Sequence, residues 1–299
     1  MSPRPAVVDV KRSSLDDGPG IRSVVFFKGC PLRCVWCQNP ETLAPRPEVQ
    51  RSIDACIGCR ACVAACPVGR ARPAAEAQPD VACRLCGACV EACPAAARRI
   101  AGTEPSIDEL VELLLRDDVF YRRSGGGVTL SGGEPALFPE FVGEVAGRLH
   151  ARGVHVLAET CGQFRWEAFA AHLLPHVSTV YFDLKIADPE RHRRWVGRDN
   201  ETIHHNFRRL AAAGTAEVLP RIPLVPSLTD DRENLLALAA LIRSAGLGRV
   251  ALLPYNPLWV TKRRALGLDM PYGRAEWMNP DEVARCEEAV AGAGLEVIH

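Results

Sequence analysis

Cysteine is the residue of this chain whose number and spacing point most directly to chemistry. Eleven of the thirteen cysteines fall into three tight groups. The first group is Cys30, Cys34 and Cys37, with the spacing CxxxCxxC. The other two groups share the spacing CxxCxxCxxxCP, and they consist of Cys56, Cys59, Cys62 and Cys66, and of Cys83, Cys86, Cys89 and Cys93. Cysteines grouped so closely in a reducing compartment indicate metal ligands rather than disulfides.

The first group has one ligand too few for a closed metal centre. A cluster of four irons and four sulfides normally takes four thiolates. Cys30, Cys34 and Cys37 provide three from one short loop, and no neighbouring cysteine or histidine completes the set. One iron would stay open to a ligand that is not protein, as at a catalytic metal site. The spacing therefore predicts a catalytic cluster.

The two longer groups repeat one short unit. ACIGCRACVAACP at residues 55–67 matches ACRLCGACVEACP at residues 82–94. This is the cysteine run of bacterial ferredoxins, in which the fourth cysteine serves the other cluster. The runs therefore predict two four-iron clusters, one held by Cys56, Cys59, Cys62 and Cys93 and the other by Cys83, Cys86, Cys89 and Cys66. Zinc is the weaker alternative, because zinc modules favour separated cysteine pairs.

Residues 48–102, which contain both runs, differ from the rest of the chain in composition and periodicity. They are rich in Cys, Ala and Pro, and they show no long helical or strand periodicity. With so few apolar residues, we expect a pseudo-symmetric, ferredoxin-like insert held together mainly by its metal. Two roles stay open for it. We favour electron relay to the first cluster, because such clusters chiefly carry electrons; the alternative is a structural or docking role.

The flanking segments, residues 1–47 and 103–299, must position the first cysteine group. Apolar runs predict strands at residues 23–28, 128–130, 154–158, 180–183, 218–224 and 250–253. Helical periodicity follows at residues 141–150, 166–174, 202–213 and 233–245, and Ser106 with Glu109 predicts a capping box before another helix. This alternation predicts an α/β fold with a parallel sheet. It suits either a partial (β/α)6 barrel or an open doubly wound sheet.

Unusual residues cluster where these strands end. The cysteine loop, SGGEP (131–135), ETCG (159–162), DLK (183–185) and LLPYN (252–256) each follow a predicted strand. In parallel α/β folds, ligands bind at the carboxyl ends of the strands. We therefore expect these five loops to form one site.

Composition narrows the class of partner and the compartment. Lys plus Arg and Asp plus Glu number 36 each, a balance that gives no support for nucleic-acid binding. The longest aliphatic stretch, residues 235–242, falls far short of the roughly 20 residues that span a bilayer. The first ten residues have no apolar signal-peptide core. We expect a cytoplasmic protein that binds no membrane, with a monomer as the default state.

The segment DDGPGIRSVVFFKGCPLRCVWCQNPE, residues 16–41, resembles the radical S-adenosylmethionine (SAM) superfamily. Within it, DGPGIR narrows the resemblance to the activating enzymes of glycyl radical enzymes, the group that includes pyruvate formate-lyase activating enzyme. The resemblance implies a partial (β/α)6 TIM-like barrel. It also implies SAM cleavage to a 5′-deoxyadenosyl radical that removes hydrogen from a glycine of a partner enzyme, with flavodoxin or ferredoxin as electron donor.

The same resemblance assigns roles to residues outside the cysteines. It implies that Trp36 lies beside the adenine of SAM and that Gly132, Gly133 and Glu134 contact its amino group. It implies that the methionyl end, with room for a monovalent cation, is lined by Glu159, Thr160, Asp183 and Lys185, and that Arg221 pairs with a carboxylate. Two positions depart from the family pattern: Gln38 and Asn256 stand where relatives often have histidine.

Two other functions are weaker alternatives. A radical SAM enzyme acting on a small molecule or peptide would share the cysteine loop, but DGPGIR and the insert favour an activating enzyme. A non-enzymatic electron carrier would leave the open three-cysteine group, SGGEP and DLK unexplained. The remaining cysteines, Cys161 and Cys286, are expected to be packing residues. Core packing is also the favoured role for most of Trp259, Trp277 and Tyr272, although they could belong to a C-terminal flap.

Overall fold

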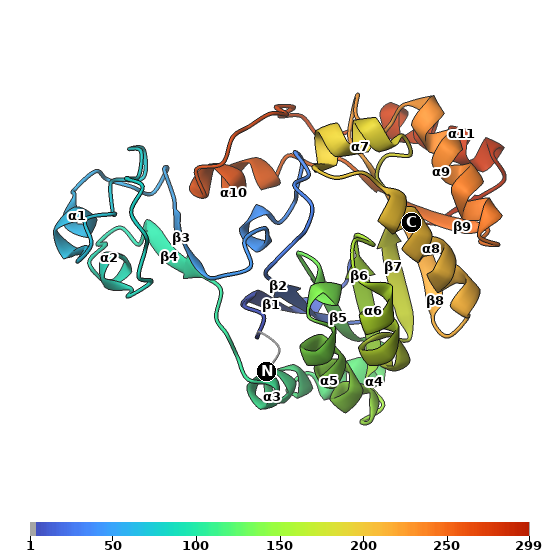
Figure 1. The fold of residues 1–299 in the computed structure, drawn as a ribbon, viewed down its shortest axis with the longest axis horizontal. Helices are drawn as coiled ribbons and strands as arrows, with labels where there is room; N and C mark the ends of the chain where they lie inside the picture. The colour runs from blue at the N-terminus through green and yellow to red at the C-terminus, as the bar shows by residue number, and fades with distance from the viewer. Residues whose placement is uncertain (1–3, 299) are drawn as a thin grey trace.

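The computed structural model describes residues 4–298, which form a large body and a smaller lobe that projects from it (Figure 1). The body is built on one sheet of eight strands: β1 (Val7–Ser14), β2 (Arg22–Phe27), β5 (Gly127–Gly132), β6 (His155–Thr160), β7 (Thr179–Asp183), β8 (Glu217–Leu224), β9 (Arg249–Pro254) and β10 (Glu296–Ile298). The lobe follows β2 in sequence and returns before the first helix of the body.

Helices connect the strands of the body. Three short 3₁₀ turns, η1 (Pro40–Thr42), η2 (Pro135–Leu137) and η3 (Leu174–His176), follow β2, β5 and α6. The α-helices are α3 (Ile107–Leu115), α4 (Asp118–Ser124), α5 (Pro139–His150), α6 (Trp166–His172), α7 (Pro189–Val196), α8 (Glu201–Ala213), α9 (Arg232–Ser244), α10 (Trp259–Ala265) and α11 (Pro280–Gly292). None of the helices within residues 4–298 combines the length and apolarity that crossing a membrane requires.

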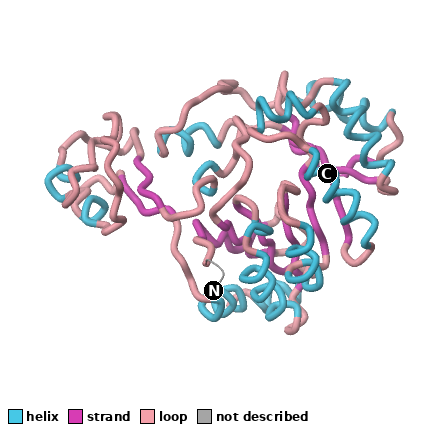
Figure 2. Tube along the Cα trace, viewed as in Figure 1, coloured by secondary structure: helices cyan, strands magenta, loops and turns pink. Residues whose placement is uncertain are grey.

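The strand order distinguishes between the two predicted architectures, the partial (β/α)6 barrel and the open doubly wound sheet. The strands lie in the order β1-β2-β5-β6-β7-β8-β9-β10, and every neighbouring pair from β2 onward is parallel. A doubly wound sheet would reverse its order at a switch point. Because each right-handed crossover here moves one strand in the same direction, the helices collect on one side. Figures 1 and 2 show α5, α6, α8 and α9 along the outer side of the curved sheet.

The predicted strands and helices form where the sequence places their apolar residues. The six predicted strands correspond to β2 and β5 to β9, each within two residues of the predicted ends. The capping box is also present: Ser106 Oγ accepts the N–H of Glu109 at 3.2 Å, and Ser106 N donates to Glu109 Oε2 at 2.8 Å. The helix that it begins, α3, buries Leu110 and Leu114 in the main core.

Several elements were not predicted, among them β1, β10 and α7. Strand β1 pairs antiparallel with β2 at one edge of the sheet, and its residues 11–13 are polar and exposed. Strand β10 has three residues at the other edge. Helix α7 contains the basic run of Arg191, Arg193 and Arg194, and its single buried polar side chain is His192. These elements lack the apolar periodicity by which helices and strands are recognised in a sequence.

The lobe is joined to the body by a two-stranded antiparallel stem. Strand β3 (Glu48–Arg51) pairs with β4 (Arg98–Ala101), with Glu48 opposite Ala101 and Arg51 opposite Arg98. The fully buried Lys28, which follows β2, donates to Glu48 Oε1 at 3.0 Å and so holds the stem against the body.

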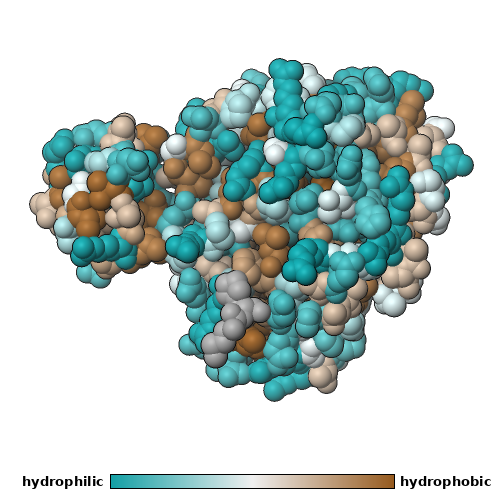
Figure 3. All heavy atoms as spheres, in the orientation of Figure 1, coloured by the Kyte–Doolittle hydropathy of each residue, from teal (hydrophilic) through white to brown (hydrophobic). Residues whose placement is uncertain are grey.

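Beyond the stem, the lobe has little apolar core. Its two short helices, α1 (Ala61–Ala65) and α2 (Ala88–Glu91), follow a left-handed residue at Arg60 and at Gly87, so the two sequence repeats share a backbone conformation. No residue of 48–102 belongs to the main hydrophobic core. Ile57 is 69% exposed, and Figure 3 shows hydrophobic atoms on the visible face of the lobe. The lobe therefore needs a source of cohesion other than an apolar core.

Candidate functional site

The three cysteines of the first group lie on the loop that follows β2. The loop is fastened on two sides: Gly29 N donates to Thr42 O at 2.7 Å, and Arg33 N donates to Val196 O at the end of α7 at 2.7 Å. Cys34 is buried, whereas Cys30 and Cys37 are half-buried. The unpredicted helix α7 is thus part of the support of the cysteine loop.

All three thiols face one cavity of about 450 Å³ at the carboxyl ends of the strands. The same cavity is lined by Trp36, Gly132, Gly133, Glu159, Thr160, Asp183, Lys185 and Arg221. The structure therefore brings together every predicted site residue of the body except Glu134, and it does so from the ends of β2, β5, β6, β7 and β8.

Two glycines let the loop after β5 approach the cysteine loop. Gly132 has φ = 109°, and a Cβ at this residue would lie 2.3 Å from the backbone nitrogen of Phe27. A Cβ at Gly133 would lie 2.2 Å from Gly29 O. Since real Cβ atoms do not come so close to other atoms, both positions require glycine.

Glu134 does not line the cavity. It is fully buried, and its carboxylate accepts the N–H of Cys161 at 2.7 Å and that of Ala136 at 3.0 Å, together with the hydroxyl of Thr160 at 2.8 Å. Burial raises the pKa of Glu134, although these hydrogen bonds oppose the shift. Its side chain joins the end of β5 to the end of β6 and so positions Thr160.

A network of charges forms one wall of the cavity. Arg221 donates through Nε to Asp183 Oδ1 at 2.9 Å and through Nη1 to Glu159 Oε1 at 2.5 Å. Asp183 Oδ2 also accepts from Lys185 Nζ at 3.1 Å. Burial opposes ionisation of Asp183, but the charges of Arg221 and Lys185 outweigh it and lower the pKa of Asp183. Two carboxylates and two cations therefore balance at this wall.

Cys161 was expected only to pack, and it does more. It is buried, but it also lines the cavity, and its thiol acts on the ionisation of Cys30. The interaction with Cys161 is the main cause of the lowered pKa of Cys30, whereas burial raises the pKa of Cys37 to about 12. The only signal in the sequence was its place directly after Thr160.

The other residues given packing roles match that expectation in part. Cys286 and Trp259 are buried in the core, whereas Trp277 is 59% exposed. The two departures from the family pattern meet at the cavity, where Gln38 Nε2 donates to the backbone oxygen of Asn256 at 3.2 Å.

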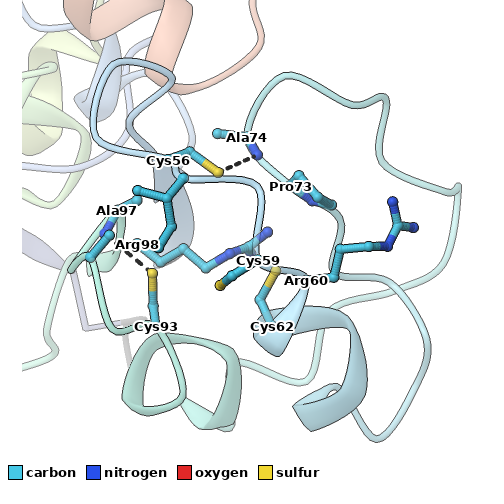
Figure 4. A pocket seen from close by; sticks show the side chains of 11 residues that line it. Cys56, Cys59, Arg60, Cys62, Pro73, Ala74, Cys93, Ala97 and Arg98 are labelled. Carbon is cyan, nitrogen blue, oxygen red and sulfur yellow. Dashed lines mark hydrogen bonds between the residues drawn. The ribbon is translucent and has the colours of Figure 1, made fainter.

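A second cavity lies in the lobe, and Figure 4 shows four cysteines around it. These are Cys56, Cys59, Cys62 and Cys93, the crossed set that the ferredoxin spacing predicts for one cluster. Backbone N–H groups point at two of the thiols: Ala74 N lies 3.3 Å from Cys56 Sγ, and Ala97 N lies 3.3 Å from Cys93 Sγ. Such hydrogen bonds to sulfur are typical of iron–sulfur sites.

Some of the cysteines predicted to hold the second cluster also lie near one another. Cys89 lies close enough to Cys83 and Cys66 for their charges to act on it. Leu85 N donates to Cys83 Sγ at 3.4 Å. Cys66 belongs to the first run and Cys83 to the second, so this set is crossed as well.

The donor atoms at both places fit iron–sulfur clusters. All thirteen cysteines are free thiols, and soft thiolates are the ligands that such clusters take. No three Cys, His, Asp or Glu side chains in residues 4–298 lie close enough to hold a single metal ion.

Known proteins resemble this chain over nearly its whole length. Residues 24–239 match the model of the Radical SAM superfamily. The benzylsuccinate synthase activating enzyme of Thauera aromatica is 38% identical over 98% of this chain and 92% of its own. The pyruvate formate-lyase 2-activating enzyme of Escherichia coli is 35% identical over 97% of this chain and 91% of its own.

Solved structures agree on the fold. SuiB of Streptococcus suis bound to its precursor peptide SuiA superposes with a TM-score of 0.53 at 11% identity, over 90% of this chain and 46% of that chain. At this identity the likeness concerns the fold alone. From the cysteine loop, the cavity at the strand ends and the matched relatives together, the chain belongs to the radical SAM superfamily and, within it, to the activating enzymes of glycyl radical enzymes.

Proposed function

We propose that the cavity at the strand ends is where this chain cleaves SAM and directs the resulting radical to a glycine of a partner enzyme. The observation that carries the proposal is that three thiols from one loop share this cavity with a charge-balanced wall of Arg221, Asp183, Lys185 and Glu159. The cavity is open to solvent and large enough for a ligand of SAM's size to enter.

Cys30, Cys34 and Cys37 would hold a four-iron, four-sulfide cluster through three of its irons. With SAM bound, such a cluster supplies the electron that yields methionine and a 5′-deoxyadenosyl radical, which takes hydrogen from a glycine Cα. The chain's own task is to bind, orient and shield the reactants. Cys34 is buried, so the loop keeps water from one side of the metal.

The other residues divide the cavity into regions that match the parts of SAM. Gly132 and Gly133 offer backbone where the amino group would lie, and Glu134 supports this segment from behind through Cys161 and Ala136. Trp36 would lie beside the adenine.

The methionyl end of SAM would face the charged wall. Thr160 lines the cavity there, and Lys185 and Arg221 provide positive charge toward a carboxylate. A monovalent cation at this end would have to share Glu159 and Asp183 with Arg221, which already contacts both.

We propose further that residues 48–102 form a ferredoxin-like domain with two four-iron clusters, while residues 1–47 and 103–299 form the radical SAM domain. The gathering of Cys56, Cys59, Cys62 and Cys93 around one cavity supports the first cluster. The closeness of Cys89 to Cys83 and Cys66 supports the second, which Cys86 would complete. Relay of electrons to the cluster of the body is the role that we favour.

The partner is a glycyl radical enzyme, and the relatives are named for several different ones. We propose flavodoxin or ferredoxin as the electron donor, because the reaction takes one electron at a time. Free thiols throughout the chain suit the cytoplasm. We retain the monomer as the expected state.

Anaerobic iron and sulfide analysis, followed by reduction in the presence of SAM, tests this function. About twelve irons per chain are expected for three clusters, together with 5′-deoxyadenosine and methionine. The paired control is Cys286→Ala, which removes a buried thiol that lines neither cavity and should leave both results unchanged. Iron near roughly eight without 5′-deoxyadenosine would contradict the proposal and favour the electron-carrier alternative.

A further inference from the structure

Arg98 occupies an unusual place in the lobe. It begins β4, yet its side chain is only 7% exposed and lines the cavity formed by Cys56, Cys59, Cys62 and Cys93. Figure 4 shows it among these four thiols. A guanidinium, which keeps its charge at all working pH values, therefore stands at the first predicted cluster.

The same side chain reaches the other cysteine set. The charge of Arg98 also acts on the thiol of Cys89, where it opposes the rise in pKa that burial causes, and its Nη2 donates to the backbone oxygen of Arg72. Cys89 belongs to the set with Cys66, Cys83 and Cys86. One guanidinium thus lines the first predicted cluster site and lies near enough to Cys89 of the second for its charge to act there.

The charge of Arg98 is not balanced by an acidic residue. Among the ion pairs of residues 4–298 none includes Arg98, and the lobe's Glu48 and Glu76 pair with Lys28 and Arg60 instead. Its recorded neighbours add positive charge: burial lowers the pKa of Arg51, and the charges of Arg98 and Arg70 lower it further. A buried cation without a counter-charge is costly.

Thiolate-bound clusters would provide that counter-charge. A four-iron cluster with four thiolates carries net negative charge, and reduction adds one more electron. The reduction potential of such clusters depends on the net charge and the hydrogen bonds around their sulfurs. A fixed cation stabilises the reduced form more than the oxidised form, because the reduced form is more negative.

We propose that Arg98 is a shared counter-ion of the two clusters of the lobe and that it raises the reduction potentials of both. This inference rests on the proposed presence of these clusters. In this role Arg98 is a positioning and tuning residue, since it holds neither the metal nor the substrate. It sets the range of donors from which the lobe can accept electrons.

The test is a potentiometric titration of the whole protein, followed by electron paramagnetic resonance, with the iron content measured first. Arg98→Met and Arg98→Gln remove the charge, and Arg98→Lys keeps it. Arg99→Met is the matched control, because Arg99 is the exposed neighbour on β4 and bonds only Gln50 at 2.6 Å. It removes the same charge without touching a cysteine.

Both neutral variants should lower the midpoint potentials of the lobe clusters by at least the equivalent of a tenfold change in the reduction equilibrium, about 59 mV for one electron. Arg98→Lys and Arg99→Met should stay near wild type, and the signal of the cluster of the body should not move. Full iron with unchanged potentials in Arg98→Met or Arg98→Gln would overturn the proposal.

Iron analysis separates the other outcomes. If both neutral variants lose the iron of the lobe while Arg98→Lys keeps it, the counter-charge is required and the proposal stands. Loss in all three variants would mean that the guanidinium fork only holds the backbone at Arg72, which refutes the proposal. Wild-type protein with about four irons would refute the lobe clusters themselves, and this inference with them.

Discussion

Lys262 Nζ lies 3.0 Å from Glu41 Oε1 and so ties helix α10 to the turn that follows the cysteine loop. The same ammonium donates to the backbone oxygen of Gln38 and to Asn39 Oδ1, both at 3.0 Å. Glu41 is buried, and its other oxygen, Oε2, has no hydrogen-bond partner. A single side chain of the C-terminal segment therefore holds three residues beside the thiols.

Replacing Lys262 by Met should release this fastening. The buried Glu41 would lose its cation, at a cost of about 1 kcal/mol in the free energy of unfolding. Amide hydrogen exchange should accelerate in residues 259–265 and 38–42 more than elsewhere. Arg264→Met, on the exposed side of the same helix, is the control. Equal exchange in the two variants would mean that α10 is held by packing, through Trp259, rather than by Lys262.

Replacing Cys30, Cys34 or Cys37 by Ala should abolish SAM cleavage. Each thiol is one of only three available to the predicted cluster of the body, and its loss leaves a second iron without a protein ligand. The measurement is 5′-deoxyadenosine formed with dithionite as reductant, with Cys286→Ala as control. A variant with full turnover would disprove the assignment of the open cluster to this loop.

Cysteines of the lobe should behave differently. With Cys59→Ser or Cys86→Ser, electron delivery from a protein donor should slow, while a strong chemical reductant still supports some cleavage. The two reductants are compared on the same preparation, and the ratio of their rates is the readout. Total loss with both reductants would indicate that the lobe is needed for folding rather than for relay.

Arg221→Met should be strongly destabilising. It would leave Glu159 and Asp183 without the cation that both contact, in a place where each is mostly buried. Breaking a buried pair in this way costs about 3–5 kcal/mol. Chemical unfolding at neutral pH provides the measurement, and Arg249→Met, which breaks an exposed pair with Glu217, should cost less than about 1 kcal/mol. Equal effects would contradict the burial of the network.

His192 should make stability depend on pH between about 4 and 6.5. Burial lowers the pKa of His192 to about 4, against a hydrogen bond between Nδ1 and Arg198 O that opposes the shift. The unfolded chain therefore binds more protons than the folded chain in this window. The stability contributed by neutral His192 is fully present above about pH 6.5 and is lost as the pH falls toward 4.

Between pH 7.5 and 5.5 this loss should be about 1 kcal/mol. His192→Gln keeps an amide donor and should flatten the dependence, whereas the exposed His205→Gln should not. Urea unfolding at the two pH values measures it. Because α7 carries Val196, which accepts the N–H of Arg33, the loop of the cysteines should loosen over the same range. An unchanged slope in His192→Gln would contradict this prediction.

Much of the body could be predicted because its strands are apolar runs with clear ends. The loops of the site were found for the same reason: residues at the ends of parallel strands meet. Side-chain direction could not be predicted. Glu134 follows the two glycines of the cavity, yet its carboxylate turns toward Thr160, because the N–H groups of Cys161 and Ala136 are available there.

The structural roles of polar segments could not be predicted either. The basic run of α7 reads as exposed surface, and only the packed structure shows that Trp195 and Val196 accept hydrogen bonds from the cysteine loop. Nothing in the sequence indicates the role of Arg98 either, since an arginine near two cysteine runs is ordinary until its burial is known. The roles of these residues depend on contacts between segments that are distant in the sequence. A periodic pattern carries no information on such contacts.

The stem of β3 and β4 has a consequence for the history of such proteins. Because Glu48 and Ala101 are paired, the chain leaves the body and returns to it at neighbouring residues. Such a segment is topologically a long hairpin, so a single insertion or deletion in a gene could add or remove it without rerouting the sheet. Electron supply and radical chemistry would then be inherited as separate parts, and a lineage could exchange one donor system for another while its SAM cavity stayed the same.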